Sequence, residues 1–346
     1  MGAGGAELSR YTDAGVDRSR ARAAVARVAE LAATTHNSSV LEGIGPFAAV
    51  WKLGNNLPPD AVLVSSTDSV GTKSKVAVAL GRHQGIGQDI VNHCVNDVLT
   101  TGADPLFFLD YFASGRIETT VLEQLAEGMA QACRANGCAL VGGETAEMPG
   151  VYGIGDYDLA GFLVGLTSAQ AVLGPTRVKA GDRLLGLPST GLHTNGYSLV
   201  RHLLAERELE YDTELPGTAG PIGDLLLAVH ASYLKPVRAL RDLGEVHALA
   251  HITGGGIIEN LPRVLPEGLA ALVDRRSWLV PPLFTALQEL GDIPEDELWR
   301  SFNMGVGMIA VVPAATVALA TQLSRFGFFE MGEVRDRQGA DRVLLR

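Results

Sequence analysis

The chain has 346 residues, of which 47% are hydrophobic and 19% are charged, and its formal net charge is −11. This length predicts about two domains with separate cores, and the negative charge disfavours nucleic acid and anionic membranes as partners. No run of about 18 apolar residues is present, so we expect no membrane-spanning helix. Three cysteines without CxxC spacing, and an N-terminus (MGAGGAELSR) without a signal-peptide pattern, predict free thiols in a soluble, cytoplasmic protein.

The first half of the chain alternates helical and strand patterns after a loose arm over 1–16. A first helix is expected from Asp17 or Ser19, with Ala21, Ala24, Val25, Val28 and Ala32 on one face. The following apolar patterns predict further helices over 86–99 and 122–133, and strands over 61–66, 106–112, 139–141 and 159–166.

A turn-rich passage over 168–182 separates the two halves and predicts an N-terminal domain over 1–170 and a C-terminal domain over 171–346. The second half then predicts strands over 183–187, 246–250, 269–273 and 304–312, with helices from Tyr197 and over 222–243, 257–265, 283–290 and 314–326. This order indicates an α/β (α+β) protein with two domains.

Acidic residues follow or interrupt the apolar runs of the first half, and glycine turns accompany several of them. They are Asp68, Asp97, Asp110, Glu144, Asp156 and Asp158, and Lys73 stands among them. Carboxylates hold divalent cations and open backbone N–H groups hold phosphate oxygens, so together they suggest a metal–polyphosphate site.

Each of these signals also has an ordinary structural explanation. The segment TDSVGTK (67–73) lacks the GxxxxGK[ST] pattern of a P-loop, and taken alone it is more typical of a turn with an Asx cap and a surface lysine. Asn96 and Asp97 fall on the polar face of an amphipathic helix, which is usually a solvated face. Asp110 could face solvent from its strand, and Gly142-Gly143 could be a hairpin turn.

Two glycine-rich turns in the second half are candidate anion sites. PSTGLHTNGYSLVR (188–201) is a polar turn that opens a helix, and HITGGGIIEN (251–260) places three glycines before another helix. His193 lies in the first turn, where a lone histidine is more often structural than catalytic. His202, His230, His247 and His251 are scattered and show no metal-ligand spacing.

Taken together, these segments closely resemble the phosphoribosylformylglycinamidine cyclo-ligases, also called aminoimidazole ribonucleotide synthetases. The resemblance runs through YTDAGVD (11–17), TDSVGTK, CVNDVLTTGADPLFFLDYFASG, GGETAEMPGVY, DYDLAGFLVG, GLHTNGYSLVR, HITGGGIIENLPRVLP and FNMGVGM (302–308). It covers nearly the whole chain. His93 departs from the family pattern, because it stands where an apolar residue is usual.

The resemblance implies a homodimer whose N-terminal mixed sheets pair, and an enzyme that uses ATP and Mg²⁺ to close the ring of formylglycinamidine ribonucleotide. It implies catalytic roles for His193, Lys73 and Asp97 and metal binding by Asp68, Asp97 and Glu144. For ATP it implies Asp68, Gly71, Thr72, Lys73, Asn96, Asp97, Asp110, Gly142, Gly143 and Glu144. For the substrate it implies Ser189, Thr190, Gly191, Asn195, Gly196, Thr253, Gly254, Gly255 and Gly256.

Related architectures leave alternatives. Thiamine monophosphate kinases look similar; a selenophosphate synthetase would carry a reactive residue near its N-terminus, where no cysteine precedes Cys94; and a hydrogenase-maturation relative would end in cysteine rather than Arg346. A non-catalytic scaffold, a protein that binds nucleotide without catalysing a reaction, is the alternative outside the enzymes.

Overall fold

A computed structural model describes residues 18–346, with side chains from residue 24 onward. The predicted arm, the cap at Asp17 and the segment YTDAGVD lie outside the described residues. The chain forms two compact units: residues up to 57 with 65–94 and 105–165 form the first, and 58–64, 95–104 and 166–346 form the second. The expected α/β class is confirmed.

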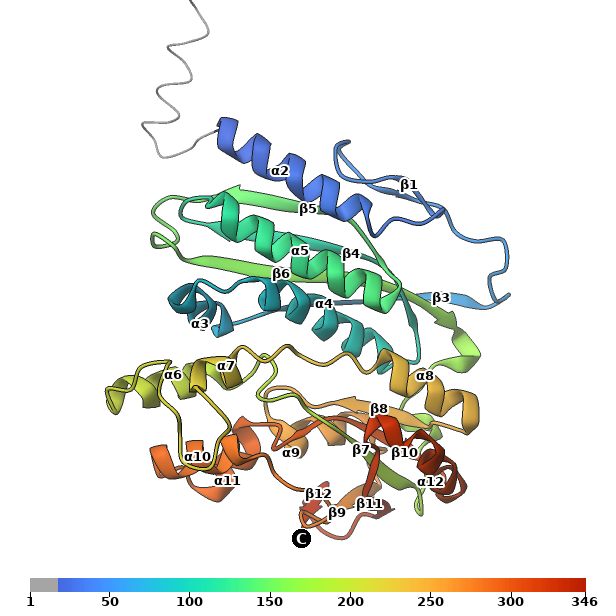
Figure 1. The fold of residues 1–346 in the computed structure, drawn as a ribbon. Helices are drawn as coiled ribbons and strands as arrows, with labels where there is room; N and C mark the ends of the chain where they lie inside the picture. Colours follow the sequence, from blue (N-terminus) through green and yellow to red (C-terminus); the bar gives the residue numbers. More distant parts are fainter. Residues whose placement is uncertain (1–17) are drawn as a thin grey trace, which may run out of the picture. The chain divides into compact units, whose positions relative to one another are not determined.

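The first unit is built on a four-stranded sheet of order β3-β6-β4-β5, with helices on one face (Figure 1). Its strands are β3 (Ala61–Ser69), β4 (Asp104–Ser114), β5 (Ala139–Glu147) and β6 (Tyr157–Ser168), and a small ribbon joins β1 (Val40–Glu42) to β2 (Val50–Trp51). Its helices are α2 (Arg18–Ala33), α3 (Lys73–Leu80), α4 (Gln84–Leu99) and α5 (Thr119–Asn136), of which α4 belongs to the second unit from Val95 onward.

Close helix packing fixes the layer that covers this sheet. A Cβ at Gly87 of α4 would lie 2.0 Å from the carbonyl oxygen of Leu125 in α5, and one at Gly128 would lie 1.9 Å from that of Gln84. Only glycine allows this approach. Within β6 buried and less buried residues alternate, so one side of the sheet packs on helices and the other remains accessible.

The second unit contains a six-stranded sheet of order β12-β9-β11-β7-β10-β8 (Figure 1). Its strands are β7 (Arg183–Pro188), β8 (Ala248–His251), β9 (Leu269–Val273), β10 (Val306–Val312), β11 (Phe329–Asp336) and β12 (Val343–Leu345). Its helices are α6 (Tyr197–Glu206), α7 (Ile222–Leu226), α8 (Leu234–Leu243), α9 (Gly256–Asn260), α10 (Pro282–Gly291), α11 (Glu295–Ser301) and α12 (Ala314–Ala320).

Several predicted elements differ from the structure. The single helix expected over 222–243 is wrong, because α7 and α8 are separated by a non-helical segment over 227–233. Pro236 lacks an N–H group and is tolerated only in a first turn, so α8 has to begin close before it. Val25 is exposed, and the strand expected over 61–66, which forms part of β3, is partly exposed along its length. The sequence patterns predicted no element at α11, β11 or β12.

Among residues 18–346, no helix combines the length and apolar character of a membrane span.

Candidate active site

In the first unit, Asp68 lies near the end of β3 and is held by two local contacts. Its Oδ2 is 2.7 Å from Nε2 of His93, and its Oδ1 accepts a hydrogen bond from the backbone N–H of Ser69. The Asp68 side chain remains 39% exposed. His93, which departs from the family pattern, therefore orients this carboxylate while leaving it accessible to a cation.

Asp110 and Glu144 occupy neighbouring strands of the same sheet. β4 and β5 pair in parallel, with Asp110 opposite Gly143 and Tyr111 opposite Glu144. A Cβ at Gly143 would lie 2.3 Å from Oδ1 of Asp110, so glycine is required by this close approach. The hairpin alternative for Gly142-Gly143 is wrong, because β5 continues through both glycines to Glu147.

Burial raises the pKa of Asp110 to about 7, and the nearby Glu144 carboxylate adds to the rise. A carboxyl in such surroundings resists ionisation, because charge is poorly solvated there. Glu144 itself is exposed, and its Oε1 accepts a hydrogen bond from the N–H of Thr145. The Glu144 side chain is thus more accessible to a cation than that of Asp110.

Asp110→Asn should stabilise the protein at alkaline pH. The folded pKa of about 7 exceeds the ordinary value of 3.8, so wild-type stability should fall as pH rises from about 4 through 7. The asparagine variant lacks this loss and should be more stable at pH 8 by up to about 4 kcal/mol, with little difference at pH 4. Chemical unfolding without divalent cations at both pH values measures the effect. An equal difference at pH 4 and 8 would contradict it.

Lys73 lies inside the first unit, in an ion pair between α3 and α4. It begins α3, its side chain is fully buried, and its Nζ is 2.7 Å from Oδ2 of the equally buried Asp89. Burial lowers the pKa of Lys73, and the Asp89 carboxylate opposes this change. This placement argues against the predicted phosphate and catalytic roles of Lys73, and indicates an internal ion pair between α3 and α4 instead.

Asn96 is also committed to internal contacts, all within the second unit. Its Nδ2 donates to the carbonyl oxygen of Ala231 at 2.8 Å, and its Oδ1 accepts from the N–H of Tyr233 at 2.9 Å. The same Nδ2 lies 3.2 Å from Nε2 of His230. Asn96 is completely buried, so its placement argues against the predicted contact with ATP.

Asp97, the next residue along α4, faces a histidine rather than standing unpaired. Its Oδ1 lies 2.8 Å from Nδ1 of His251, at the end of β8, and its side chain is 29% exposed. The sequence could not reveal this partner, because the two residues are far apart in the chain. A carboxylate has two oxygens and can keep such a contact while binding a cation.

The first polar turn holds His193 in an uncommon conformation. His193 has a φ of 62°, in the left-handed region that few non-glycine residues adopt, and it is almost completely buried. The backbone N–H of Thr190 donates to its Nε2 at 3.2 Å. Since a backbone N–H can only donate, the neutral ring carries its proton on Nδ1. Strain of this kind persists where surrounding contacts enforce it.

The same turn is closed by a network that the sequence did not predict. Asn303 donates from Nδ2 to the carbonyl oxygen of Gly191 at 2.8 Å, and its Oδ1 accepts from Ser189 Oγ at 3.0 Å. The helix after the turn, α6, begins at Tyr197 as expected, with Gly196 at φ 81° before it. Asn303 lies in the segment FNMGVGM, which only the family resemblance had pointed out, and no role was predicted for it.

The glycine turn over 253–256 lies against the first turn. A Cβ at Gly254 would be 3.2 Å from Oδ1 of Asn195, and Gly255 and Gly256 have φ values of 92° and 60°. Asn260 Nδ2 donates to the carbonyl oxygens of Gly254 and Gly256 at 3.0 and 2.8 Å. The structure therefore brings together the two turns that were predicted to hold the substrate. Substrate binding remains a prediction for Ser189, Thr190, Gly191, Asn195, Gly196 and Thr253–Gly256.

Three buried histidines lie close together, and one of them belongs to the first turn. One ring nitrogen from each of His193, His230 and His251 lies within 4.8 Å of the others. However, the His193 and His230 rings stack with centroids 3.9 Å apart and an angle of 17°. Nitrogen lone pairs lie in the ring planes, so two nearly parallel rings cannot direct them to one metal ion. We assign the cluster to stacking and hydrogen bonding.

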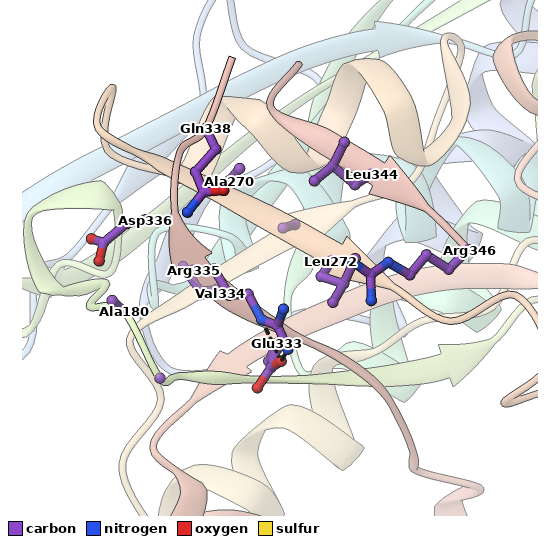
Figure 2. Close-up of a pocket in the computed structure, with 12 residues that line it drawn as sticks. Ala180, Ala270, Leu272, Glu333, Val334, Arg335, Asp336, Gln338, Leu344 and Arg346 are labelled. Atoms are coloured by element: carbon purple, nitrogen blue, oxygen red, sulfur yellow. Dashed lines mark hydrogen bonds and ion pairs between the residues drawn. The ribbon is translucent and has the colours of Figure 1, made fainter. Parts of the chain in front are cut away.

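A cavity of about 370 Å³ lies elsewhere in the second unit (Figure 2). It is lined by β9, β11 and the end of the chain, and none of the predicted site residues borders it. Glu333 in its wall accepts from Arg183 Nη1 at 2.9 Å and from Arg335 Nε at 2.6 Å. Glu333 is thus paired with two arginines, and the cavity contains none of the residues predicted to bind ATP, metal or substrate.

Comparison with known families agrees with the two-unit architecture. The N-terminal domain model of the AIR synthase related proteins matches residues 45–167, and the C-terminal domain model matches residues 179–344. The fold resembles the thiamine-monophosphate kinase from Stenotrophomonas maltophilia (TM-score 0.67, 20% identity, 92% of this chain and 94% of that one). It also resembles the hydrogenase maturation protein HypE in complex with ATP (TM-score 0.66, 20% identity, 91% and 88%). These features define a protein of the AIR synthase related class.

More similar relatives identify the family. The phosphoribosylformylglycinamidine cyclo-ligase of Myxococcus xanthus is 47% identical over 97% of this chain and 98% of its own length. That of Methylobacillus flagellatus is 47% identical over 95% of both chains, and that of Thermoanaerobacter sp. (strain X514) is 43% identical over 95% and 98%. The chain belongs to the phosphoribosylformylglycinamidine cyclo-ligase family. It is an ATP-using enzyme that forms a C–N bond by ring closure.

Proposed function

We propose that this enzyme converts formylglycinamidine ribonucleotide to aminoimidazole ribonucleotide, with ATP giving ADP and phosphate. The full-length similarity to cyclo-ligases carries the proposal. The formamide oxygen is a poor leaving group, so transfer of the γ-phosphoryl group to it is required first. The amidine nitrogen then attacks the formyl carbon. The bond from this carbon to the phosphorylated oxygen breaks, phosphate departs with the former formamide oxygen, and the amidine nitrogen loses a proton. Catalysis by positioning and charge neutralisation fits this chemistry.

ATP binding with Mg²⁺ is proposed for the acidic residues. In the first unit, Asp68 and Glu144 offer carboxylate oxygens on side chains that solvent can reach, and a hard cation prefers such donors; metal binding by Asp97, in the second unit, remains a prediction. Bound Mg²⁺ would neutralise charge on the ATP phosphates. The backbone around Gly71 and Thr72, and the close β4–β5 approach at Gly142 and Gly143, remain our prediction for the nucleotide loop.

His193 is proposed to handle the proton of ring closure. Because Thr190 occupies Nε2, the neutral imidazole presents a donor at Nδ1. A neutral imidazole gives up a proton only as its other nitrogen gains one, so donation from Nδ1 to the departing phosphate oxygen is coupled to uptake of the amidine proton at Nε2, where it replaces the Thr190 contact. The adjoining turns over 189–196 and 253–256 offer backbone N–H groups for the ribose phosphate of the substrate.

A homodimer is proposed through the accessible face of the four-stranded sheet. Phe162 on β6 is 44% exposed, and Trp51 packs on Phe107 of β4 with ring centroids 5.2 Å apart. An exposed apolar sheet face of this kind marks an interaction surface. The helices cover the opposite face, so a second copy of this sheet is the occupant that the family resemblance implies.

Phe162→Lys should convert the dimer to a monomer. A lysine on this face would bring a charge into an apolar interface, where desolvation is costly. Light scattering after size-exclusion chromatography should show twice the 36.4 kDa chain mass for the wild type and the single mass for the variant. Leu279→Lys, at a 95% exposed leucine of the second unit, is the control and should remain dimeric. A monomeric wild type would refute the proposed dimer.

The proposed reaction is tested by ADP release with and without formylglycinamidine ribonucleotide. Release should depend on the substrate and match the aminoimidazole ribonucleotide formed. ATP binding without any turnover would favour the non-catalytic scaffold instead.

A further inference from the structure

His230 is a buried residue to which neither the sequence patterns nor the proposed reaction assigns a role. It lies in the segment over 227–233 that separates α7 from α8, and its side chain is completely buried. A buried, polar ring is costly to retain unless its nitrogens are hydrogen-bonded. Packing of the core alone therefore does not explain why a histidine occupies this position.

The nitrogens of His230 are held by three other residues of the second unit. Its Nε2 lies 3.0 Å from Nε2 of His251 and 3.2 Å from Nδ2 of Asn96, and its Nδ1 lies 3.5 Å from Thr194 Oγ1. Asn96 cannot turn away, because two backbone groups fix both ends of its amide. These contacts fix the plane of the His230 ring.

The face of that fixed ring supports His193. The two rings stack at 3.9 Å, and the His193 ring is confined further by β10, where a Cβ at Gly307 would lie 2.6 Å from its Cε1. The His193 ring is thus confined by the His230 ring, by β10 and by the Thr190 N–H on its Nε2, which together allow it one orientation. His230 thereby helps to hold a residue whose backbone occupies the left-handed region.

We propose that His230 is a positioning residue of this cyclo-ligase, which orients the His193 ring for proton donation through their stacked contact. The proposal rests on the proposed role of His193. His230 need not touch the substrate, because it acts through His193. Loss of the stack should let the imidazole of His193 rotate, and misplacement of a catalytic group lowers turnover more than substrate binding.

Two substitutions separate the ring face from the ring nitrogens. His230→Gln can still offer a hydrogen-bonding group to Asn96 and His251, but it has no aromatic face. We expect nearly wild-type thermal stability, a kcat about tenfold lower, and a nearly unchanged KM for ATP. His230→Phe keeps the face and loses the nitrogens, so it should be less stable yet recover most of the kcat lost in His230→Gln. Activity that follows stability across the two variants would overturn the proposal.

A double-mutant cycle supplies the decisive comparison. His193→Asn is suitable because asparagine tolerates a positive φ. In this background His230→Gln should lower kcat by less than about twofold, because the residue that it positions is absent. An equal fall of about tenfold in both backgrounds, or none in the wild-type background, would overturn the proposal.

The controls distinguish this inference from the proposed reaction itself. Substrate-dependent ADP release by the wild type tests the reaction, whatever the variants do. If His193→Asn retains near-normal turnover, His193 has no catalytic role and the proposal for His230 fails with it. His202→Gln, at an exposed histidine of α6, is the matched substitution and should leave kcat unchanged.

Discussion

His193→Gln should lower the kcat of ring closure by about 100-fold or more, with little change in ATP affinity. The imidazole has its Nε2 occupied by the Thr190 N–H and its proton on Nδ1, and glutamine cannot release a proton to a departing phosphate. Steady-state kinetics of substrate-dependent ADP release, together with ATP binding by calorimetry, measure the two quantities separately.

The backbone of His193 calls for a second variant. Because its φ is 62°, a substitution could disturb the turn rather than the chemistry. Asparagine adopts this region more readily, so His193→Asn should fold normally and show the same loss of kcat. Near-normal turnover in either correctly folded variant would remove His193 from the mechanism.

Lys73→Met should destabilise the protein by about 3–5 kcal/mol. The substitution leaves the carboxylate of Asp89 buried without its counter-charge, and the desolvation cost of that group is then uncompensated. The double variant Lys73→Met/Asp89→Leu removes both charges and should recover most of the lost stability. Urea unfolding of the three proteins measures the free energies.

ATP affinity distinguishes this internal role from the phosphate contact that the sequence suggested. The folded fraction of the double variant should bind ATP about as tightly as the wild type. A normal stability for Lys73→Met together with a large loss of ATP affinity would show that Lys73 reaches the nucleotide after all.

The buried ion pair of Lys73 shows what a local pattern omits. The segment TDSVGTK places a cation next to a glycine turn after a strand, which is how a phosphate-binding lysine looks in one dimension. Its partner Asp89 lies a helix later, and only the packing of α3 on α4 brings the two side chains within 2.7 Å. Burial of this kind depends on tertiary contacts that spacing alone does not encode.

His230 was missed for a related reason. Apolar residues recur almost continuously over 222–243, so the pattern predicted one helix and gave His230 no special place. Pro236 was the available signal for the break, because proline belongs in a helix's first turn. The contacts of His230 with Asn96 and His251 join segments far apart in the chain, and no sequence pattern relates them.

Other parts of the molecule were predictable because their signals are local. The amphipathic period gave α4 and α5, and the apolar runs gave the central strands of both sheets, with ends that differ by a few residues. The turns before Tyr197 and Ile257 are rich in residues typical of turns, so their positions could be predicted from the sequence. The contact between Asn195 and Gly254 could not be predicted, because it depends on how the chain folds.

The fate of the formyl oxygen tests the proposed reaction most directly. The enzyme would be supplied with ATP, Mg²⁺ and formylglycinamidine ribonucleotide carrying ¹⁸O at the formyl position. Phosphorylation of that oxygen requires the label to appear in the released inorganic phosphate, with one labelled phosphate for each aminoimidazole ribonucleotide formed. Label released into water, with unlabelled phosphate, would contradict the mechanism.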